Sequence, residues 1–138
     1  MKTYVSSYVG ALAALLALDA VWLSTMAERL YRPMLGDLLA RDFEVLPALV
    51  FYALYVFGVV FFAAIPALRL GGSRTALING AVLGLVAYGT YDFTNQATLR
   101  HWPAIVTGLD LAWGTFLTSA SAVAGYFAGK ATRGAGVT

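Results

Sequence analysis

Four long and almost uncharged stretches make up most of this sequence, and they limit the folds that the chain can adopt. Residues 3–27, 45–68, 75–99 and 101–129 are each long enough to cross a bilayer as a helix, which takes about 20 apolar residues. Only 12% of the 138 residues are charged, whereas a soluble domain has about 25%. Backbone groups inside a bilayer must be hydrogen-bonded within the protein, which favours helices. The sequence therefore predicts a single all-α domain over residues 1–138, a polytopic membrane four-helix bundle.

Charged residues between these stretches predict the orientation of the chain in the membrane. One side of the predicted bundle carries basic residues without acids, namely Lys2, Arg69, Arg74, Lys130 and Arg133. The other side carries a mixture, namely Arg29, Arg32, Arg41 and Arg100 with Glu28, Asp37, Asp42 and Glu44. The positive-inside rule counts Lys and Arg and largely ignores acids. Both termini are therefore predicted to lie in the cytoplasm.

The composition also excludes several kinds of chemistry. The chain has no cysteine, so disulfides, thiolate catalysis and Cys-based metal sites are excluded. His101 is the only histidine, so no metal site is predicted, and no phosphate-cradling loop or other cofactor motif is present. A net charge of +2, spread along the chain, does not fit a nucleic-acid surface. The partners that we expect are the lipid bilayer and a small-molecule or lipid ligand.

Three further segments predict how the helices connect and pack. Residues 28–44 form either a short amphipathic helix at the membrane interface or an ordered loop over the end of the bundle. An aromatic stripe at helical spacing in the second stretch is expected to pack against other helices; it consists of Phe51, Tyr55, Gly58 and Phe62. Gly80 and Gly84 predict the close approach of another helix, which belongs either to the same chain or to a second copy in a homodimer.

The third stretch carries a polar face near its end. At 100° per residue, Tyr88, Tyr91, Asp92 and Asn95 are expected on one side of a helix together with Gly84. A carboxyl, an amide and two phenols are costly within a bilayer unless they face protein or water. We therefore expect this face to form the floor of the binding site.

Two more acids interrupt the first and fourth stretches. Asp19, Asp92 and Asp110 each lie roughly 10–13 Å from the outer end of their stretch, at 1.5 Å per residue, so we expect them in one layer. Leu18-Asp19-Ala-Val-Trp22 is echoed by Leu109-Asp110-Leu-Ala-Trp113, and each motif places Asp and Trp on one helix face. Such a pair either holds neighbouring helices together through polar contacts or forms a cation site with an aromatic wall. The second stretch has no acid and is expected to form an apolar wall.

These residues together make up the predicted ligand-binding site: Asp19, Trp22, Tyr88, Tyr91, Asp92, Asn95, Asp110 and Trp113. Three carboxyls close together in a low-dielectric layer cannot all be ionised. Asp92 has phenol and amide donors on its own face, so we expect it to be the acid that ionises, while Asp19 and Asp110 stay protonated longer. The alternative is that all three acids are protonated and only hold the helices together. Intramembrane acids typically mark paths for ions, protons or substrates, which favours a functional role.

Several of these motifs occur together in a known family. They are Leu-Asp-x-x-Trp-Leu (18–23), Tyr31 with Leu35-Gly36, Phe51-Tyr52, Tyr-Asp-x-Thr-Asn-x-Ala-Thr-Leu (91–99), Trp102 and Asp-Leu-Ala-Trp-Gly (110–114). The chain resembles a bacterial family of small membrane proteins of unknown function over nearly its whole length, and 91–99 is the most specific part. The resemblance implies a four-span protein of the bacterial cytoplasmic membrane, and it implies no activity.

Two classes of function remain open at this point. The first is the binding or transport of a small cationic or amphipathic ligand through an outward-facing pocket lined by the intramembrane aspartates. The second is a membrane enzyme or enzyme subunit that acts on a lipid, with paired carboxyls as general acid and base. The chain has no metal or nucleophile signature, which favours binding over catalysis. A scaffold held through Gly80 and Gly84 would explain the glycines but not the acids.

Overall fold

The computed structural model is an all-helical bundle and describes residues 1–40, 42 and 44–134. Its helices are α1 (Lys2–Met26), α2 (Arg32–Leu35), α3 (Val45–Val59), α4 (Ile65–Leu70), α5 (Gly72–Thr98) and α6 (Ala104–Gly134). Two π-helical turns, Ala27–Tyr31 and Val60–Ala64, join α1 to α2 and α3 to α4 without a break. The described residues contain no strand. These continuous helices form the four-helix bundle that the uncharged stretches predict.

The polar segment 28–44 begins as a continuation of the first helix. α2 ends where Gly36 adopts a positive φ of 46°, and a short 3₁₀ turn over Gly36–Leu38 follows. A positive φ is readily available to glycine because it has no Cβ. Leu39 is then extended. Arg41 and Phe43 of this segment lie outside the described residues. The segment therefore combines a helical extension of α1 with an irregular connection to α3.

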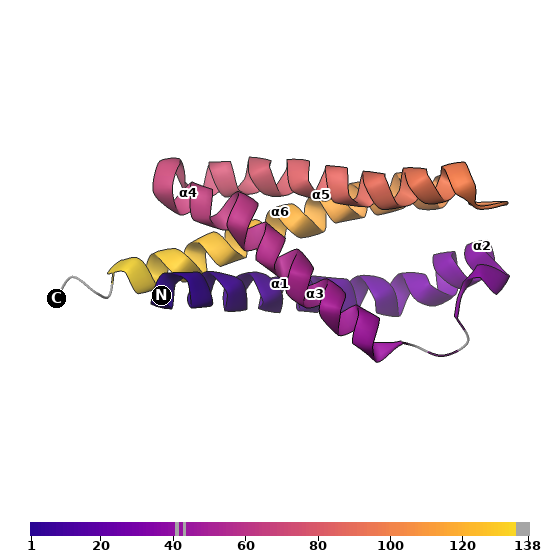
Figure 1. Cartoon of the computed structure of the whole chain (residues 1–138), viewed down its shortest axis with the longest axis horizontal. Helices are drawn as coiled ribbons and strands as arrows, with labels where there is room; N and C mark the ends of the chain where they lie inside the picture. Colours follow the sequence, from indigo (N-terminus) through magenta and orange to yellow (C-terminus); the bar gives the residue numbers. More distant parts are fainter. Residues whose placement is uncertain (41, 43, 135–138) are drawn as a thin grey trace.

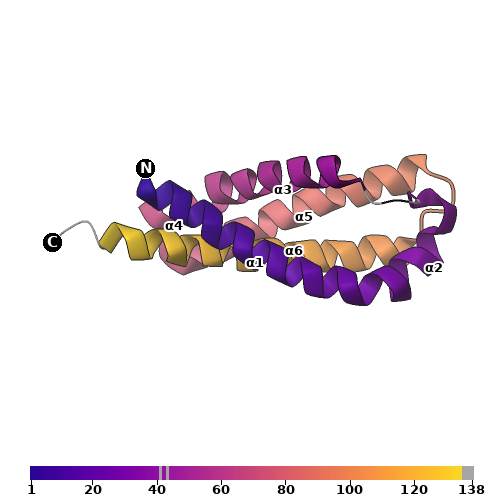
Figure 2. The same ribbon diagram turned by 90° about the horizontal axis from the view of Figure 1, so that it is seen from below.

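The helices lie roughly along one axis, with α6 packed between α1 and α5 (Figures 1 and 2). α3 crosses the bundle diagonally and leads into α4 near the end that carries both termini (Figure 1). α2 and the turn between α5 and α6 lie at the opposite end. The basic residues of the chain termini and of the α4–α5 turn are therefore gathered at one end, which we call the terminal end; the other is the α2 end.

Glycines bring the backbones of α5 and α6 into contact. A Cβ atom on Gly80 would lie 2.9 Å from the Cβ of Ala122, and one on Gly84 would collide with the carbonyl oxygen of Gly114. Real Cβ atoms essentially never come so close. Gly10 of α1 approaches Ala128 of α6 in the same way. The close contact expected at Gly80 and Gly84 is thus made within one chain.

The distribution of side chains is that of a protein in lipid. Large apolar residues cover the outside, as at Leu46 and Leu54 of α3, which are 72% and 68% exposed. Polar residues such as Thr118 and Ser121 are fully buried instead. Two continuous helical segments, Lys2–Leu38 and Val45–Leu70, are long and apolar enough to cross a membrane. Contiguous exposed apolar surface of this extent marks a membrane or protein contact.

The aromatic stripe on the second stretch does not pack as expected. Phe51 and Phe62 are exposed, and only Tyr55 faces inward, where its hydroxyl lies 2.7 Å from that of Thr118. The π-helical turn Val60–Ala64 accommodates an extra residue. It therefore rotates Phe62 out of line with the residues before it. The stripe thus faces the surroundings of the bundle over most of its length.

Candidate functional site

The three intramembrane acids all point into the bundle. Asp92 of α5 is 0% exposed, Asp110 of α6 is 7% exposed and Asp19 of α1 is 8% exposed. Buried carboxyls are costly unless they are protonated, hydrogen-bonded or paired. What surrounds each acid therefore decides what it can do, and the three surroundings differ.

Asp110 is the end of a hydrogen-bonded chain that joins three helical segments. The Tyr31 hydroxyl, in the π-helical turn after α1, donates to Asp110 Oδ1 at 2.5 Å. Trp22 Nε1 donates in turn to the Tyr31 hydroxyl at 2.9 Å. The Trp22 ring stacks on Trp113 of α6, with ring centroids 4.4 Å apart and planes 8° from parallel. Asp110 is thus held by the Tyr31 phenol, which is itself held by Trp22.

The two Leu-Asp-x-x-Trp motifs explain why the indoles meet. α1 and α6 run in opposite directions, so Trp22 lies toward the α2 end from Asp19 whereas Trp113 lies toward the terminal end from Asp110. The two indoles are therefore brought to one level between the two acids. The two copies of the motif thus contact each other across the α1–α6 interface through their tryptophans.

Asp19 has a phenol partner from α3. The Tyr52 hydroxyl donates to Asp19 Oδ2 at 2.6 Å. Tyr55, one turn further along α3, contacts Thr118 and packs edge-on against Tyr88 at 6.4 Å between ring centroids. The second stretch was expected to be an apolar wall, but two of its tyrosines reach polar groups in the core. That expectation rested on the absence of charged residues and did not take the tyrosine hydroxyl groups into account.

Asp92 has no hydrogen-bond partner for either carboxylate oxygen within the described residues. The donors expected for it point elsewhere. Tyr91 is 60% exposed and packs edge-on against Trp102, 5.9 Å between ring centroids. Adjacent helical residues are 100° apart, so Tyr91 cannot share the buried direction of Asp92. Tyr88 packs over Gly114, and Asn95 is half-buried and makes no hydrogen bond to either oxygen of Asp92. The prediction that Asp92 has the best local donors is wrong.

Helix register places the acids in two layers and not in one. Gly80 lies against Ala122 and Gly84 against Gly114 and Thr118, so the antiparallel register brings Asp92 level with Asp110. The Trp22–Trp113 stack sets the register of α1 against α6. By that register Asp19 lies about six residues, or about 9 Å, closer to the terminal end than Asp110 does. Asp92 and Asp110 form a pair, and Asp19 lies apart from them.

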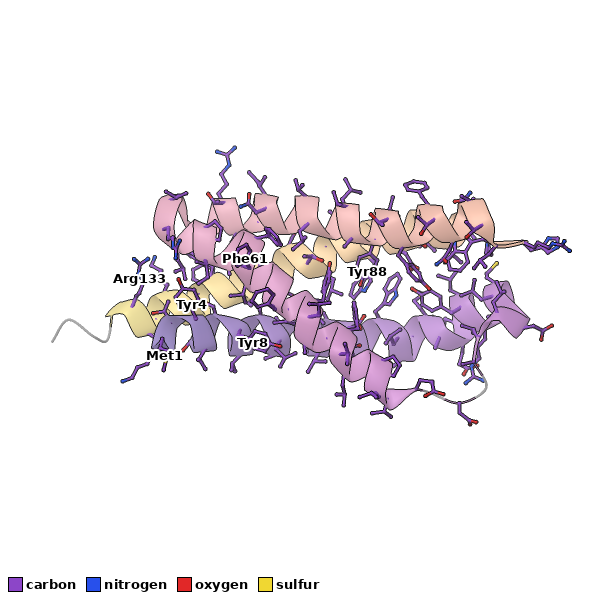
Figure 3. All side chains as sticks on the ribbon, in the orientation of Figure 1. Met1, Tyr4, Tyr8, Phe61, Tyr88 and Arg133 are labelled. Atoms are coloured by element: carbon purple, nitrogen blue, oxygen red, sulfur yellow. The ribbon has the colours of Figure 1, made fainter. Side chains whose placement is uncertain are left out.

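A pocket at the α2 end reaches Asp110. Its volume is about 310 Å³, and it is lined by Leu23, Ala27, Tyr31, Arg32, Leu35, Leu39, Tyr91, Trp102 and Asp110. A second pocket, of about 320 Å³, lies between α3 and α5 and is lined by Phe51, Tyr55, Ala87, Tyr88 and Tyr91. Figure 3 shows the Tyr88 side chain toward the α2 half of the bundle, away from Tyr4 and Arg133 at the terminal end. In the described part of the chain, no three His, Asp or Glu side chains are grouped to hold a metal ion.

The structure brings together most of the predicted site residues and adds three that sequence reasoning missed. Tyr31 joins Trp22 to Asp110, Trp113 stacks on Trp22, and Tyr52 joins Asp19 to α3. Tyr31 and Tyr52 both occur in the motifs that carry the family resemblance, which is the signal that could have identified them. Tyr55 has no such signal apart from a hydroxyl in an apolar stretch.

Comparison with known proteins gives a match to a family model. A family model described as "Predicted membrane protein (DUF2177)" matches residues 4–127, which is most of the chain. The match includes the three acids, both Leu-Asp-x-x-Trp motifs, Tyr31 and Tyr52. No curated protein and no solved structure matches the chain.

Proposed function

The chain belongs to the DUF2177 family of predicted membrane proteins, and from this premise we propose that it binds or transports a small cationic or amphipathic ligand. The observation that carries the proposal is the position of Asp110. A buried carboxyl lines a pocket whose other walls are mostly apolar and aromatic. Concave apolar sites with a few placed polar groups are typical of small-molecule binding.

The chemistry of the pocket suits a positive charge on an apolar body. Tyr31, Tyr91 and Trp102 contribute aromatic faces, which attract cations. Arg32 at the rim is paired with Glu28 at 3.0 Å, so its charge is balanced. The hydrogen bond from Tyr31 supports a negative charge on Asp110. A ligand cation would meet that charge at the base of the pocket.

Asp92 has a different role in this proposal. It lies level with Asp110, without a hydrogen-bond donor among the described residues. Two neighbouring carboxyls away from water are not both ionised at low cost. We assign to Asp92 the proton that is exchanged when a cation enters, so that ligand binding and proton release are linked.

The proposed orientation has four spanning helices, both termini in the cytoplasm of a bacterial cell and the α2 end outside. It is supported by the five basic residues at the terminal end and by the positive-inside rule. A cysteine at position 37 should react with an impermeant maleimide on intact cells, and one at position 72 should not. Labelling at position 72 and not at position 37 would show that the orientation is the opposite of the proposed one.

Titration by tryptophan fluorescence tests the binding site, with tetraphenylphosphonium as the cationic probe. Binding should weaken as pH falls, because protonation of Asp92 lowers the negative charge that Asp92 and Asp110 together present to the cation. Asp110→Asn should lower the affinity about tenfold or more, the loss expected when a charged contact is removed. Asp92→Asn should retain binding at high pH and lose the pH dependence.

Asp37→Asn is the matched control, since it neutralises an exposed acid at the same end that does not line the pocket. It should bind the probe as the unmodified protein does. Identical titration curves for the unmodified protein and Asp110→Asn would refute the proposed site. Identical pH profiles for the unmodified protein and Asp92→Asn would refute the role of Asp92.

A further inference from the structure

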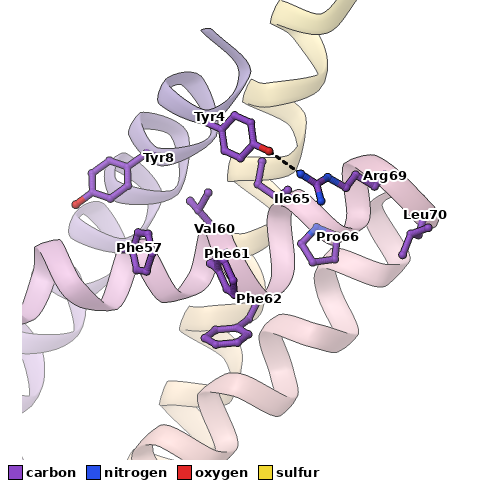
Figure 4. A pocket seen from close by; sticks show the side chains of 10 residues that line it. All are labelled: Tyr4, Tyr8, Phe57, Val60, Phe61, Phe62, Ile65, Pro66, Arg69 and Leu70. Atoms are coloured by element: carbon purple, nitrogen blue, oxygen red, sulfur yellow. Dashed lines mark hydrogen bonds between the residues drawn. The ribbon is translucent and has the colours of Figure 1, made fainter. Parts of the chain in front are cut away.

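A second hollow lies on the surface of the bundle at the terminal end, away from the pocket that reaches Asp110. It is a groove of about 580 Å³ between the first turns of α1 and the α3–α4 segment, and the residues that line it include Tyr4, Tyr8, Phe57, Phe61, Phe62 and Arg69 (Figure 4). Apart from Arg69 and the two tyrosine hydroxyls, its walls are apolar. The Tyr8 hydroxyl is bound to the Ala53 carbonyl of α3 at 3.0 Å. The polar groups left to face the groove are thus at one end of it.

The floor of the groove is a run of exposed aromatic rings. Phe57, Phe61 and Phe62 are each 57–58% exposed, and Phe61 packs against both of the others with centroids 5.8 and 4.9 Å apart. The π-helical turn Val60–Ala64 lies in this segment and turns Phe61 and Phe62 outward together. π-helical turns occur frequently at functional sites. The rings face the space that lipid chains fill around a membrane protein.

The polar end of the groove opens into a small basic pocket. This pocket, of about 130 Å³, shares Tyr4, Ile65 and Arg69 with the groove and adds Thr3, Leu68 and Arg133. The Arg69 guanidinium donates to the Tyr4 hydroxyl at 2.7 Å (Figure 4). Arg133 donates to the Leu68 carbonyl. Each of these contacts uses one of the five N–H groups of a guanidinium. No described acidic side chain is paired with either arginine.

The dimensions match one leaflet of a bilayer. Arg69 is twelve residues from Phe57, which is about 18 Å along a helix. Half of the hydrocarbon core of a bilayer is about 15 Å thick. Arg69 lies one residue from the end of α4, where a long basic side chain reaches the headgroup level. A lipid with its headgroup at Arg69 would therefore lay an acyl chain over the phenylalanines.

We propose that this groove and the adjoining pocket bind an anionic phospholipid of the inner leaflet. The phosphate lies between Arg69 and Arg133, with Tyr4 and Thr3 as hydroxyl partners, and one acyl chain lies along Phe57, Phe61 and Phe62. Arginine forks match the geometry of phosphate oxygens. Basic pockets between membrane helices on the cytoplasmic side are suited to anionic headgroups. The net positive charge of the terminal end favours an anionic over a zwitterionic lipid.

Native mass spectrometry of the purified full chain tests the proposal. The protein in detergent is mixed with phosphatidylglycerol or with phosphatidylcholine of the same acyl chains. One phosphatidylglycerol should be retained in preference to phosphatidylcholine. Arg69→Gln should lower its retention about tenfold, which corresponds to about 1.4 kcal/mol. Arg133→Gln should act in the same direction, and Phe61→Ala should lower the retention of both lipids.

Arg74→Gln is the matched control, because Arg74 is an exposed basic residue of the same end that lines neither hollow. It should leave retention unchanged. If Arg69→Gln does not fold, Arg69→Lys keeps the charge without the planar fork and should still lower retention several-fold. The proposal would be overturned if the two lipids are retained equally, or if Arg69→Gln and Arg74→Gln lose phosphatidylglycerol to the same extent. A dimer that carries no lipid would also overturn it. The groove lies at the opposite end from Asp110, so these results are independent of the cation site.

Discussion

Replacing Asp92 by leucine should make the protein more stable. Leucine has the same branching as aspartate, with two methyl groups in place of the two carboxylate oxygens. Neither oxygen of Asp92 has a hydrogen-bond partner in the described part of the chain, although the residue is 0% exposed. The substitution therefore removes a buried polar group without breaking a bond. The same substitution at Asp110 breaks the hydrogen bond from Tyr31.

The two substitutions should change the free energy of unfolding in opposite directions. A buried polar group without a partner costs about 1–3 kcal/mol, and the methyl groups, which are larger than oxygens, reduce what is regained. For Asp92→Leu we expect a net gain of about 1 kcal/mol. Asp110→Leu leaves the Tyr31 hydroxyl without its acceptor, and hydrogen bonds between membrane helices are worth about 0.6 kcal/mol, up to about 1.7. A loss of about 1 kcal/mol is expected there.

Reversible unfolding in mixed micelles, with sodium dodecyl sulfate as denaturant and circular dichroism as the signal, measures both free energies. Asp92→Asn is the control, because it keeps a polar group at the same place and should change the free energy of unfolding little. If Asp92→Leu destabilises the protein as much as Asp110→Leu does, then Asp92 makes a stabilising contact and the reasoning fails. If Asp92→Leu is more stable and its cation binding no longer depends on pH, stability is given up for function at this position.

Other changes test the contacts around the site with the same unfolding assay. Tyr31→Phe removes two hydrogen bonds and Tyr52→Phe removes one. The first should lower the free energy of unfolding by about 1.2 kcal/mol and the second by about 0.6 kcal/mol. Equal losses would contradict the hydrogen bond between Trp22 and Tyr31. Gly84→Ala places a methyl group against the backbone of α6 and should cost about 1–3 kcal/mol. Gly58→Ala meets no atom within 4 Å and should be neutral or stabilising by up to about 1 kcal/mol, and a large loss there would show that α3 packs more closely than described.

The elements of the bundle could be predicted because each depends on nearby residues. Uncharged stretches of sufficient length become helices wherever water is excluded, whatever the partners. The spacing of Gly80 and Gly84 likewise identifies a contact face without naming the neighbour. The burial of Asp19, Asp92 and Asp110 follows from the cost of exposing a carboxyl to lipid.

The partners of the acids could not be predicted because they come from distant parts of the chain. Tyr31 is 79 residues from Asp110, and Tyr52 is 33 residues from Asp19. Which phenol meets which carboxyl depends on how α1 and α3 are placed against α6, and helix periodicity contains no information on that. Tyr91 is a different case, since its position next to Asp92 already excluded a shared direction.

The stacked indoles of Trp22 and Trp113 should give the protein a distinct spectroscopic signal. Two indole rings 4.4 Å apart and nearly parallel are close enough for their electronic transitions to couple. The third indole, Trp102, packs against Tyr91 instead. The near-ultraviolet dichroism of this protein should therefore contain a component that belongs to the pair alone. Any event that slides α1 along α6 by a single turn would abolish this component, and would be visible without a label.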